Sequence, residues 1–369
     1  MNAKLIHLGW FWVLIAFSGA ALAATPLGLP PTPIPKDNPQ SEVKIKLGDK
    51  LFHDTRFSST GAVSCATCHE RTKAFTDSPL SVSEGINKLT GTRNAPTVVN
   101  SAFMTSMFWD GREPDLEGQS AGPFINPVEM GLPNHEPILK IVRSDSEYKK
   151  LFKQAFKVSD SKITMDHVKK AIAAFERTII SGDSPFDRYH YGGNKSAMSE
   201  SAVRGLDVFL GQGRCVSCHT ISQTHAIFTD NKFHNLGIGF ARIDKDVKDL
   251  ATAFSKSRRT LEEIDVEVLA NKNTSELGRF VVSDQWRDMG SFKTPTLRNI
   301  AETKPYMHDG SLKTLKDVVD FYNNGGRVKS DDPVNGFQSG GIRPLELSDQ
   351  QKEDLVSFME ALTSPEYAK

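Results

Sequence analysis

The sequence contains two Cys-x-x-Cys-His motifs, which begin at residues 65 and 215. In such a motif the two thiols can attach a c-type haem covalently, and the histidine is placed to coordinate the iron. A Cys-x-x-Cys pair alone also suits a disulfide or half of a zinc site. The two motifs use all four cysteines of the chain, which favours two haem c groups. The residues that would hold them are Cys65, Cys68 and His69 for the first and Cys215, Cys218 and His219 for the second.

The function depends on the ligand that lies opposite each histidine. Two six-coordinate haems would make an electron carrier, whereas an open position allows chemistry on peroxide or oxygen. No histidine occurs between His69 and Trp109, and Met104 and Met107 fit an ordinary packing segment. We therefore expect an open iron at the first haem.

Glu129 is a candidate for acid–base chemistry at such an iron. A carboxylate above the metal can take a proton from the near oxygen of peroxide and deliver it to the far one. Taken alone, however, Glu129 is more often a surface or capping acid, and Trp109 is more often a core aromatic.

Several blocks of the sequence resemble the bacterial di-haem cytochrome c peroxidase family, over essentially the whole mature chain. The blocks are the two haem motifs, RNAPT at 93–97, FWDGR at 108–112, GP and NPVEMG within 122–131, and KTPTLRN to PYMHDG within 293–310. The resemblance implies two cytochrome c-like domains, each with one covalently bound haem, and a calcium ion between them.

The resemblance also implies roles for individual residues. Calcium would be held by Asn94 and by the backbone carbonyls of Thr303 and Pro305. Trp109 falls at the position of an inter-haem tryptophan, a bridge for electron transfer. Gln119 and Glu129 fall in the pocket of the peroxidatic haem. His234 and His308 are expected to be hydrogen-bonding groups near haem or calcium.

Two departures from the ordinary peroxidases point to a MauG-like branch of the family. Residues 81–92 lack the histidine that caps the peroxidatic haem in those enzymes, which predicts a constitutively open site. Tyr322 stands where they place a methionine ligand of the second haem, and Pro123 matches the branch as well. A phenolate favours oxidised iron. The alternative is that Tyr322 is a core aromatic on one helical face with Leu315 and Val319.

The leading hypothesis is a haem peroxidase that reduces hydrogen peroxide at the open haem. Electrons would come from a redox protein, either a small cytochrome or a cupredoxin, through the second haem. The alternative is a MauG-type enzyme that oxidises tryptophan residues of a partner protein during cofactor maturation. Gly213 weakens that alternative, because the branch has a tryptophan there. A second alternative is a non-enzymatic di-haem electron carrier.

The elements that position these residues are predicted to be mostly α-helical. Helices are expected over residues 41–52, before the first motif, over 166–180, over 315–322 with Thr314 as a cap, and over 348–362, where Ser348 and Gln351 form a capping box. A helical face formed by Val203, Leu206 and Leu210 precedes the second motif. Residues 241–290 are polar and poorly periodic and are interpreted as a long loop insertion.

The domain organisation follows from the spacing of the two motifs, which is about one domain length. Residues 1–23 read as a signal peptide, with an apolar stretch from Leu8 to Phe17 and small residues before Ala24. The proline-rich stretch 24–40 is interpreted as a tether. The N-terminal cytochrome c-like domain, with the peroxidatic haem, is placed at 41–195. The C-terminal domain, with the electron-transfer haem, is placed at 196–369.

Composition narrows the function classes further. The 369 residues include 45 basic and 45 acidic side chains, so the chain lacks the basic excess of a nucleic-acid-binding protein. The apolar leader is shorter than a membrane span. We therefore expect export to the periplasm, with no stable membrane insertion after cleavage and no nucleic-acid partner.

Overall fold

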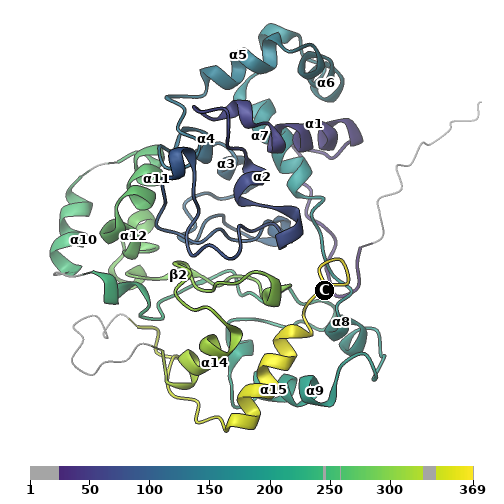
Figure 1. Cartoon of the computed structure of the whole chain (residues 1–369), viewed down its shortest axis with the longest axis vertical. Coiled ribbons are helices and arrows are strands. Elements are labelled where there is room, and N and C mark those ends of the chain that lie inside the picture. Colours follow the sequence, from purple (N-terminus) through teal and green to yellow (C-terminus); the bar gives the residue numbers. More distant parts are fainter. Residues whose placement is uncertain (1–24, 244–246, 258, 327–337, 369) are drawn as a thin grey trace, which may run out of the picture.

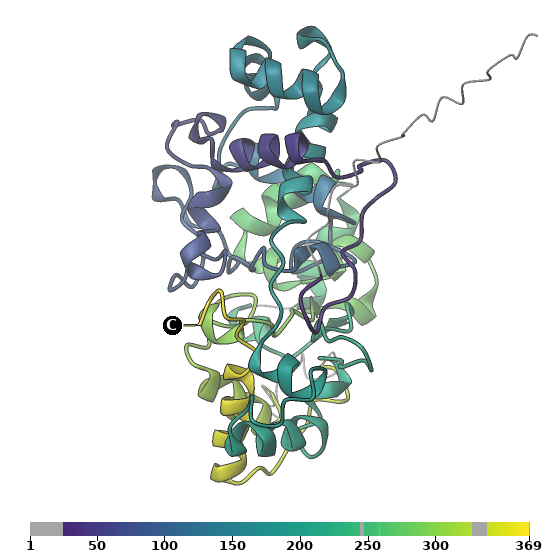
Figure 2. The same ribbon diagram turned by 90° about the vertical axis from the view of Figure 1, so that its right-hand side faces the viewer.

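The computed structural model describes residues 25–243, 247–257, 259–326 and 338–368. The expected signal peptide lies outside the described residues. Two helical units are stacked along the long axis of the molecule, and a third group of helices lies beside the first unit (Figure 1). The view turned by 90° shows the same stacking (Figure 2).

The first unit contains the helices that surround the first haem motif. They are α1 (Glu42–His53), α2 (Cys65–Cys68), α3 (Leu116–Gln119), α4 (Gly122–Ile125), α5 (Glu136–Ser144), α6 (Ser146–Phe156) and α7 (Met165–Glu176). The second unit contains α8 (Pro185–His190), α9 (Glu200–Leu210), α14 (Leu315–Asn323) and α15 (Asp349–Glu360). Between the units, β1 (Phe233–His234) pairs antiparallel with β2 (Phe292–Lys293), with Phe233 opposite Lys293.

The two units are built around the same pair of crossing helices. In the first, α1 crosses α7 so closely that a Cβ at Gly48 would lie 1.9 Å from the carbonyl oxygen of Ala171. In the second, α9 crosses α15, and a Cβ at Gly205 would lie 1.9 Å from the oxygen of Asp354. This repeated contact supports a duplicated unit.

Aromatic pairs repeat beside these crossings. The ring of Phe52 lies 5.3 Å from that of Phe175, and the ring of Phe209 lies 4.9 Å from that of Phe358. Each pair joins the two crossing helices of its own unit, so the two cores are arranged alike.

The loops that follow the two haem motifs also repeat in detail. Thr97 Oγ1 donates to the carbonyl of Ala74 at 2.6 Å, and Thr296 Oγ1 donates to the carbonyl of Ile227 at 2.7 Å. Asn100 and Asn299 both adopt left-handed backbone conformations, and their side-chain oxygens accept the backbone N–H of a serine in each unit. The interval in sequence from Thr97 to Thr296 equals that from Asn100 to Asn299, so these loops share one register.

The boundary between the two units lies between α7 and α8, because α7 packs into the first hydrophobic core and α8 into the second. Phe186 of α8 lies in the second core, 5.2 Å from the ring of Phe228. This residue falls within the range 41–195 that the sequence assigns to the first domain. The difference arises because α8 buries its aromatic side against elements from the C-terminal half.

The proline-rich segment 25–40 is extended, as its composition favours, and it lies against both units. The carbonyl of Gly28 accepts hydrogen bonds from Arg298 and from the backbone N–H of Ala226 in the second unit. Asn38 is fully buried and donates to Glu117 and to the carbonyl of Lys170 in the first unit. The segment is thus anchored near both of its ends, at Gly28 and at Asn38.

The interpretation of residues 241–290 as a loop insertion is wrong. The segment contains α10 (Val247–Lys256), α11 (Leu261–Ala270), α12 (Lys272–Glu276) and α13 (Phe280–Ser283). These helices bury a core of their own, which includes Phe254, Val268 and Phe280. The helical periodicity is weak in the sequence because these helices are short, belong to a small subdomain and contain many polar residues.

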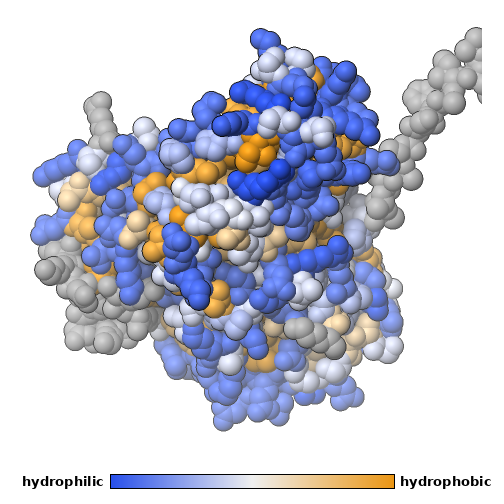
Figure 3. Space-filling model, turned by 45° about the horizontal axis from the view of Figure 1, so that its top comes forward, coloured by the Kyte–Doolittle hydropathy of each residue, from blue (hydrophilic) through white to orange (hydrophobic). Residues whose placement is uncertain are grey.

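The surface view shows a mainly hydrophilic face with hydrophobic residues in small separate patches (Figure 3). Across the described ranges, no helix combines the length and the apolar character that crossing a bilayer requires.

The helix crossing generates a stability prediction. Gly48→Ala should lower the free energy of unfolding by about 1–3 kcal/mol, because the new methyl group meets the backbone of α7 and overpacks the crossing. The measurement is urea unfolding of the haem-loaded protein. Gly340→Ala is the matched control, since a Cβ there meets no described residue within 4 Å, and it should change stability by less than about 0.5 kcal/mol. An equal effect of the two substitutions would contradict the crossing argument.

Candidate functional site

A single cavity of about 620 Å³ lies between the two units and reaches both haem motifs. Its volume is within the usual range for cofactor sites. The structure brings all the predicted site residues to its wall. They are Cys65, Cys68, His69, Asn94, Trp109, Gln119, Pro123, Glu129, Cys215, Cys218, His219, Thr303, Pro305 and Tyr322.

The histidine of each motif is held in the same way. His69 Nδ1 lies 3.1 Å from the carbonyl oxygen of Phe75, and His219 Nδ1 lies 2.8 Å from that of Phe228. Burial lowers the pKa of both histidines, which keeps the rings neutral. A neutral ring that donates Nδ1–H to a carbonyl presents the lone pair of Nε2, the form that coordinates a metal.

The carbonyls that receive these hydrogen bonds come from strained backbone. Phe75 has φ 54° and Phe228 has φ 56°, values that bulky residues rarely adopt. Both side chains are buried in their cores. Such strain persists only where the surrounding packing fixes it, and it often marks a functional position.

A thiol, a carboxylate and an imidazole meet beside the second motif. The ligand atoms of Cys218, Asp230 and His234 lie within 4.8 Å of one another, a set that would also suit a transition metal. His234 Nε2 bonds Asp230 at 2.8 Å. Covalent attachment of haem consumes the Cys218 thiol, so the remaining pair is a hydrogen-bonded one.

The short helices α3 and α4 bring Gln119 and Pro123 to the wall of the first unit's cavity, and the turn after α4 brings Glu129. Glu129 Oε2 is buried and has no hydrogen-bond partner in the described part of the chain. Burial raises the pKa of Glu129 to about 8, and the negative charge of Asp265 contributes to this increase. The positive charge of Arg112 opposes it. An unpartnered carboxyl of this kind can exchange a proton near neutral pH.

A buried ionic network behind Glu129 was not anticipated from the sequence. Asp265 of α11 accepts from Arg112 at 2.7 Å and from Asn126 at 2.9 Å. Arg112 in turn bonds Asp110 at 3.0 Å. The capping box of Thr260 and Glu263 marks the start of α11 and could have revealed the helix. The pairing with Arg112, however, has no local signal.

The loop of residues 81–92 is fixed against the backbone that carries Glu129. Ile86 N–H donates to the carbonyl of Glu129 at 2.8 Å. A Cβ at Gly85 would lie 2.1 Å from the carbonyl oxygen of Val128, so this approach requires glycine. The loop thus lies at the edge of the pocket without offering an imidazole to it.

The duplication aligns the second unit's α14 with α3. Asp115 caps α3 by accepting the Gly118 N–H, and Thr314 caps α14 by accepting the Asp317 N–H. The interval that relates Thr97 to Thr296 also relates these two caps. Further along the two elements, the same interval relates a proline, Pro123, to a phenol, Tyr322.

The Tyr322 side chain lies in the wall of the cavity near the second motif. Burial raises the pKa of this phenol, with a further contribution from the motif's thiols. Its hydroxyl therefore stays protonated unless a nearby cation stabilises the phenolate. Iron bound at His219 would be such a cation.

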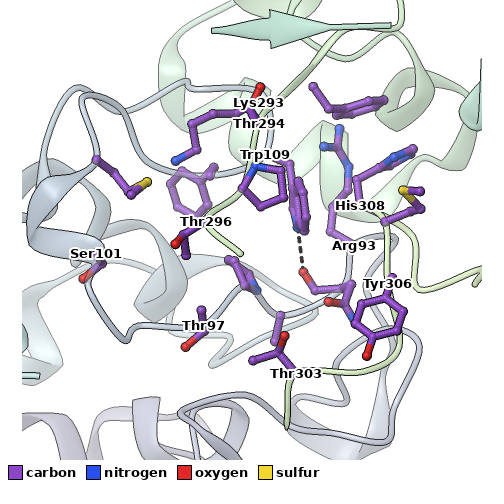
Figure 4. Close-up of a pocket in the computed structure, with 18 of the residues that line it drawn as sticks. Arg93, Thr97, Ser101, Trp109, Lys293, Thr294, Thr296, Thr303, Tyr306 and His308 are labelled. Carbon is purple, nitrogen blue, oxygen red and sulfur yellow. Dashed lines mark hydrogen bonds between the residues drawn. The ribbon is translucent and has the colours of Figure 1, made fainter. Parts of the chain in front are cut away.

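Trp109 and His308 meet at the seam between the units, joined through the backbone of Asn94 (Figure 4). Trp109 Nε1–H donates to the carbonyl of Asn94 at 2.9 Å, and the Asn94 N–H donates to the carbonyl of His308 at 2.8 Å. His308 Nε2 bonds Glu276 at 2.8 Å, and its ring stacks on Phe292 at 3.6 Å. His308 thus belongs to a hydrogen-bonded network, and Trp109 has a fixed orientation.

Comparison with known proteins agrees with this site. A family model described as di-haem cytochrome c peroxidase matches residues 42–196. Methylamine utilization protein MauG of Methylorubrum extorquens is 34% identical over 330 residues, which cover 89% of this chain and 81% of that protein. Cytochrome-c peroxidase IdrP1 of Pseudomonas sp. (strain SCT) is 34% identical over 364 residues, which cover 95% of this chain and 90% of that protein.

Solved structures give the same result. A MauG-like protein associated with microbial copper homeostasis aligns with a TM-score of 0.75 and 32% identity, covering 95% of this chain and 99% of that one. The diheme peroxidase BthA from Burkholderia thailandensis shares the fold, with a TM-score of 0.66 and 23% identity. The chain therefore belongs to the di-haem cytochrome c peroxidase family.

Family membership confirms several predictions from the sequence. The fold is mostly α, with two cytochrome c-like domains, and the cofactors are two haem c groups. The protein is a haem oxidoreductase of the peroxidase class, and the activity supported is peroxide reduction. Its reactants are peroxide together with a redox partner or a protein substrate.

Proposed function

We propose that the haem at His69 is the open, peroxide-reducing centre and that the haem at His219 is closed by Tyr322. The observation that carries this proposal is that Pro123 and Tyr322, which are related by the same sequence interval as the caps of α3 and α14, both lie in the wall of the cavity. A proline side chain has no ligand atom, whereas a phenol has one. The second unit thus offers an axial ligand where the first offers none.

The reaction at the first haem is the reduction of H₂O₂ by two electrons and two protons to two molecules of water. Bound iron supplies the redox chemistry that no side chain in the pocket provides. Glu129 accepts a proton from the near oxygen of peroxide and returns it to the far oxygen. Gln119, on the same wall, orients the peroxide. Pro123 lines the same cavity and offers no ligand atom to an iron that His69 would hold.

Electrons reach this pocket through the seam. Trp109 lines the cavity that reaches both motifs, and the Asn94 carbonyl fixes its indole. Tyr322, as an anionic oxygen ligand, favours oxidised iron at the second haem and lowers its potential. A haem held by Cys215, Cys218, His219 and Tyr322 would exchange electrons with the first site, and the donor protein would supply them.

A calcium ion bound by Asn94, Thr303 and Pro305 would stabilise the seam. Within the described residues, the carbonyls of Thr303 and Pro305 accept no backbone hydrogen bond outside helices and strands. Asn94 lines the same cavity, and its backbone N–H donates to the carbonyl of His308, close in sequence to Pro305. Free carbonyl oxygens with a side-chain amide oxygen suit calcium, which takes oxygen ligands from loops.

The proposed electron donor is a small cytochrome or a cupredoxin. The MauG-type alternative, oxidation of tryptophan in a partner protein, is favoured by Tyr322 and by the relatives named MauG. Gly213 counts against it, because a Cβ there would lie 2.7 Å from the Val208 carbonyl and 3.3 Å from Cys215 Sγ. There is thus no room at Gly213 for a side chain that could carry electrons from the surface to the second haem. The electron-carrier alternative would require an axial ligand at the position of Pro123.

We place the protein in the periplasm, after cleavage of residues 1–23. The leader supports this location, as does the chemistry of c-type haem, which is attached after export. The mainly hydrophilic face in Figure 3 also suits a protein with no stable membrane insertion.

The axial assignment predicts one high-spin and one low-spin haem in the oxidised protein. Tyr322→Met should raise the potential of the second haem, because a thioether stabilises reduced iron better than a phenolate does. The measurement is spectroelectrochemistry of both haems. Tyr306→Phe is the control, since it removes another hydroxyl from the cavity wall and should leave the potential unchanged. An unaltered spectrum and potential in Tyr322→Met would remove Tyr322 as a ligand.

The acid–base assignment predicts that Glu129→Gln slows the reaction with peroxide by about 10²–10⁴-fold, the usual contribution of such a group. Stopped-flow mixing of the fully loaded enzyme with peroxide measures this step directly. Glu136→Gln removes an exposed carboxylate of α5 and should react at the wild-type rate. If both variants react equally fast, Glu129 is not the base.

The buried network predicts a pH effect. Glu129 must be ionised to accept a proton, so the rate should rise with pH toward its pKa of about 8. The negative charge of Asp265 holds that pKa up, so Asp265→Asn should lower it and move the rising limb to lower pH. The pH profile of the peroxide reaction tests this, with the exposed Asp249→Asn as control. If the pH at which the rate rises is the same in Asp265→Asn as in the wild type, the charge of Asp265 does not control the pKa of Glu129.

A further inference from the structure

The duplicated helices differ at one position beside the haem motifs. The aromatic residues at the two crossings, Phe175 on α7 and Phe358 on α15, occupy equivalent positions. The next residue is Glu176 in the first unit and Met359 in the second. Both of these side chains line the cavity. The two units thus present a carboxyl group and a thioether at matching places.

Glu176 is buried, with 4% of its surface exposed, and its Oε2 has no hydrogen-bond partner among the residues that the structure describes. The adjacent Arg177 does not neutralise it, because both terminal nitrogens of Arg177 bond Glu117 of α3, at 2.8 and 2.7 Å. An ionised carboxylate in such a place carries an uncompensated charge, so it has a strong tendency to hold a proton.

The charges that act on Glu176 are those of Arg177 and Glu117, which bond each other. On α1, the helix that crosses α7, Lys44 donates to Asn38 and to the Pro39 carbonyl. The first motif lies close by, since the charge of Glu176 contributes to the raised pKa of the Cys65 thiol. Glu129 acts on the same thiol more weakly. A haem attached at Cys65 would therefore place a variable charge close to Glu176.

We propose that Glu176 is a proton-binding site coupled to the charge of the first haem. When that haem gains one electron from the donor, its iron loses one positive charge, and the carboxylate of Glu176 takes up one proton from solvent. Loss of the electron reverses both changes, so charge and mass balance at each step. The second haem lacks this coupling because Met359 cannot titrate.

Burial, and to a lesser degree the Glu117 charge, raise the pKa of Glu176 to about 8 against the opposing effect of Arg177. A group in this range changes its protonation near neutral pH when the neighbouring charge changes. The inference concerns an equilibrium property of the haem-loaded protein and does not require that peroxide be the substrate. Its failure would thus leave the peroxidase proposal intact.

The test is the pH dependence of the first haem's midpoint potential, measured by spectroelectrochemistry on the loaded protein. In the wild type the potential should fall as pH rises, by at most about 59 mV per pH unit for one proton per electron. In Glu176→Gln this dependence should flatten. The exposed Glu136→Gln should keep it, and Met359→Leu should leave both haems as in the wild type. An undiminished slope in Glu176→Gln, or its loss only in Glu129→Gln, would overturn the proposal.

Two further measurements guard against a variant that fails to load haem. Glu176→Met copies the residue that the second unit accepts at this position, and it should flatten the same dependence. In the wild type, infrared difference spectra between reduced and oxidised protein should contain a band of a protonated carboxyl group that appears on reduction. Absence of that band in the wild type would refute proton uptake at a carboxyl group.

Discussion

The hydrogen bond from each motif's imidazole to a strained backbone carbonyl is the interaction on which both haem sites depend. It fixes the tautomer and the direction of His69 and of His219 before any metal chemistry is possible. The carbonyls of Phe75 and Phe228 can stay in left-handed conformations only because the two hydrophobic cores hold these aromatic side chains. The packing of each core thus orients the iron-binding histidine of its unit, because it holds the carbonyl oxygen to which that histidine donates.

Because both units hold their histidine in the same way, a different residue at one position is enough to give the two haem sites different chemistry. Pro123 and Tyr322 occupy equivalent places, yet only one of them carries a possible ligand atom. Glu176 and Met359 differ in the same manner, since one can bind a proton and the other cannot. The asymmetry required of an enzyme that reacts at one haem and stores charge at another therefore needs no difference in fold.

Local signals in the sequence were sufficient for much of this description. The helices at Leu315–Asn323 and Asp349–Glu360 were predictable because their caps, Thr314 and Ser348, bond within one turn. The residues of the cavity wall were predictable because they cluster in motifs. The network of Asp265 was not, since its partners Arg112 and Asn126 lie 153 and 139 residues away. No periodicity or spacing encodes such a pairing.

The same network gives residues 241–290 a role in the pocket of the first unit, although their polar sequence resembles an insertion. Helix α11 belongs by sequence to the C-terminal half, but its Asp265 supports the pocket of the first unit. Arg112 links this carboxylate to Asp110, next to Trp109 at the seam. A displacement of the seam would therefore change the charge beside Glu129, because the same ionic chain touches both. The residues to which we assign acid–base chemistry and electron transfer are thus linked by one ionic chain, although they lie on different elements.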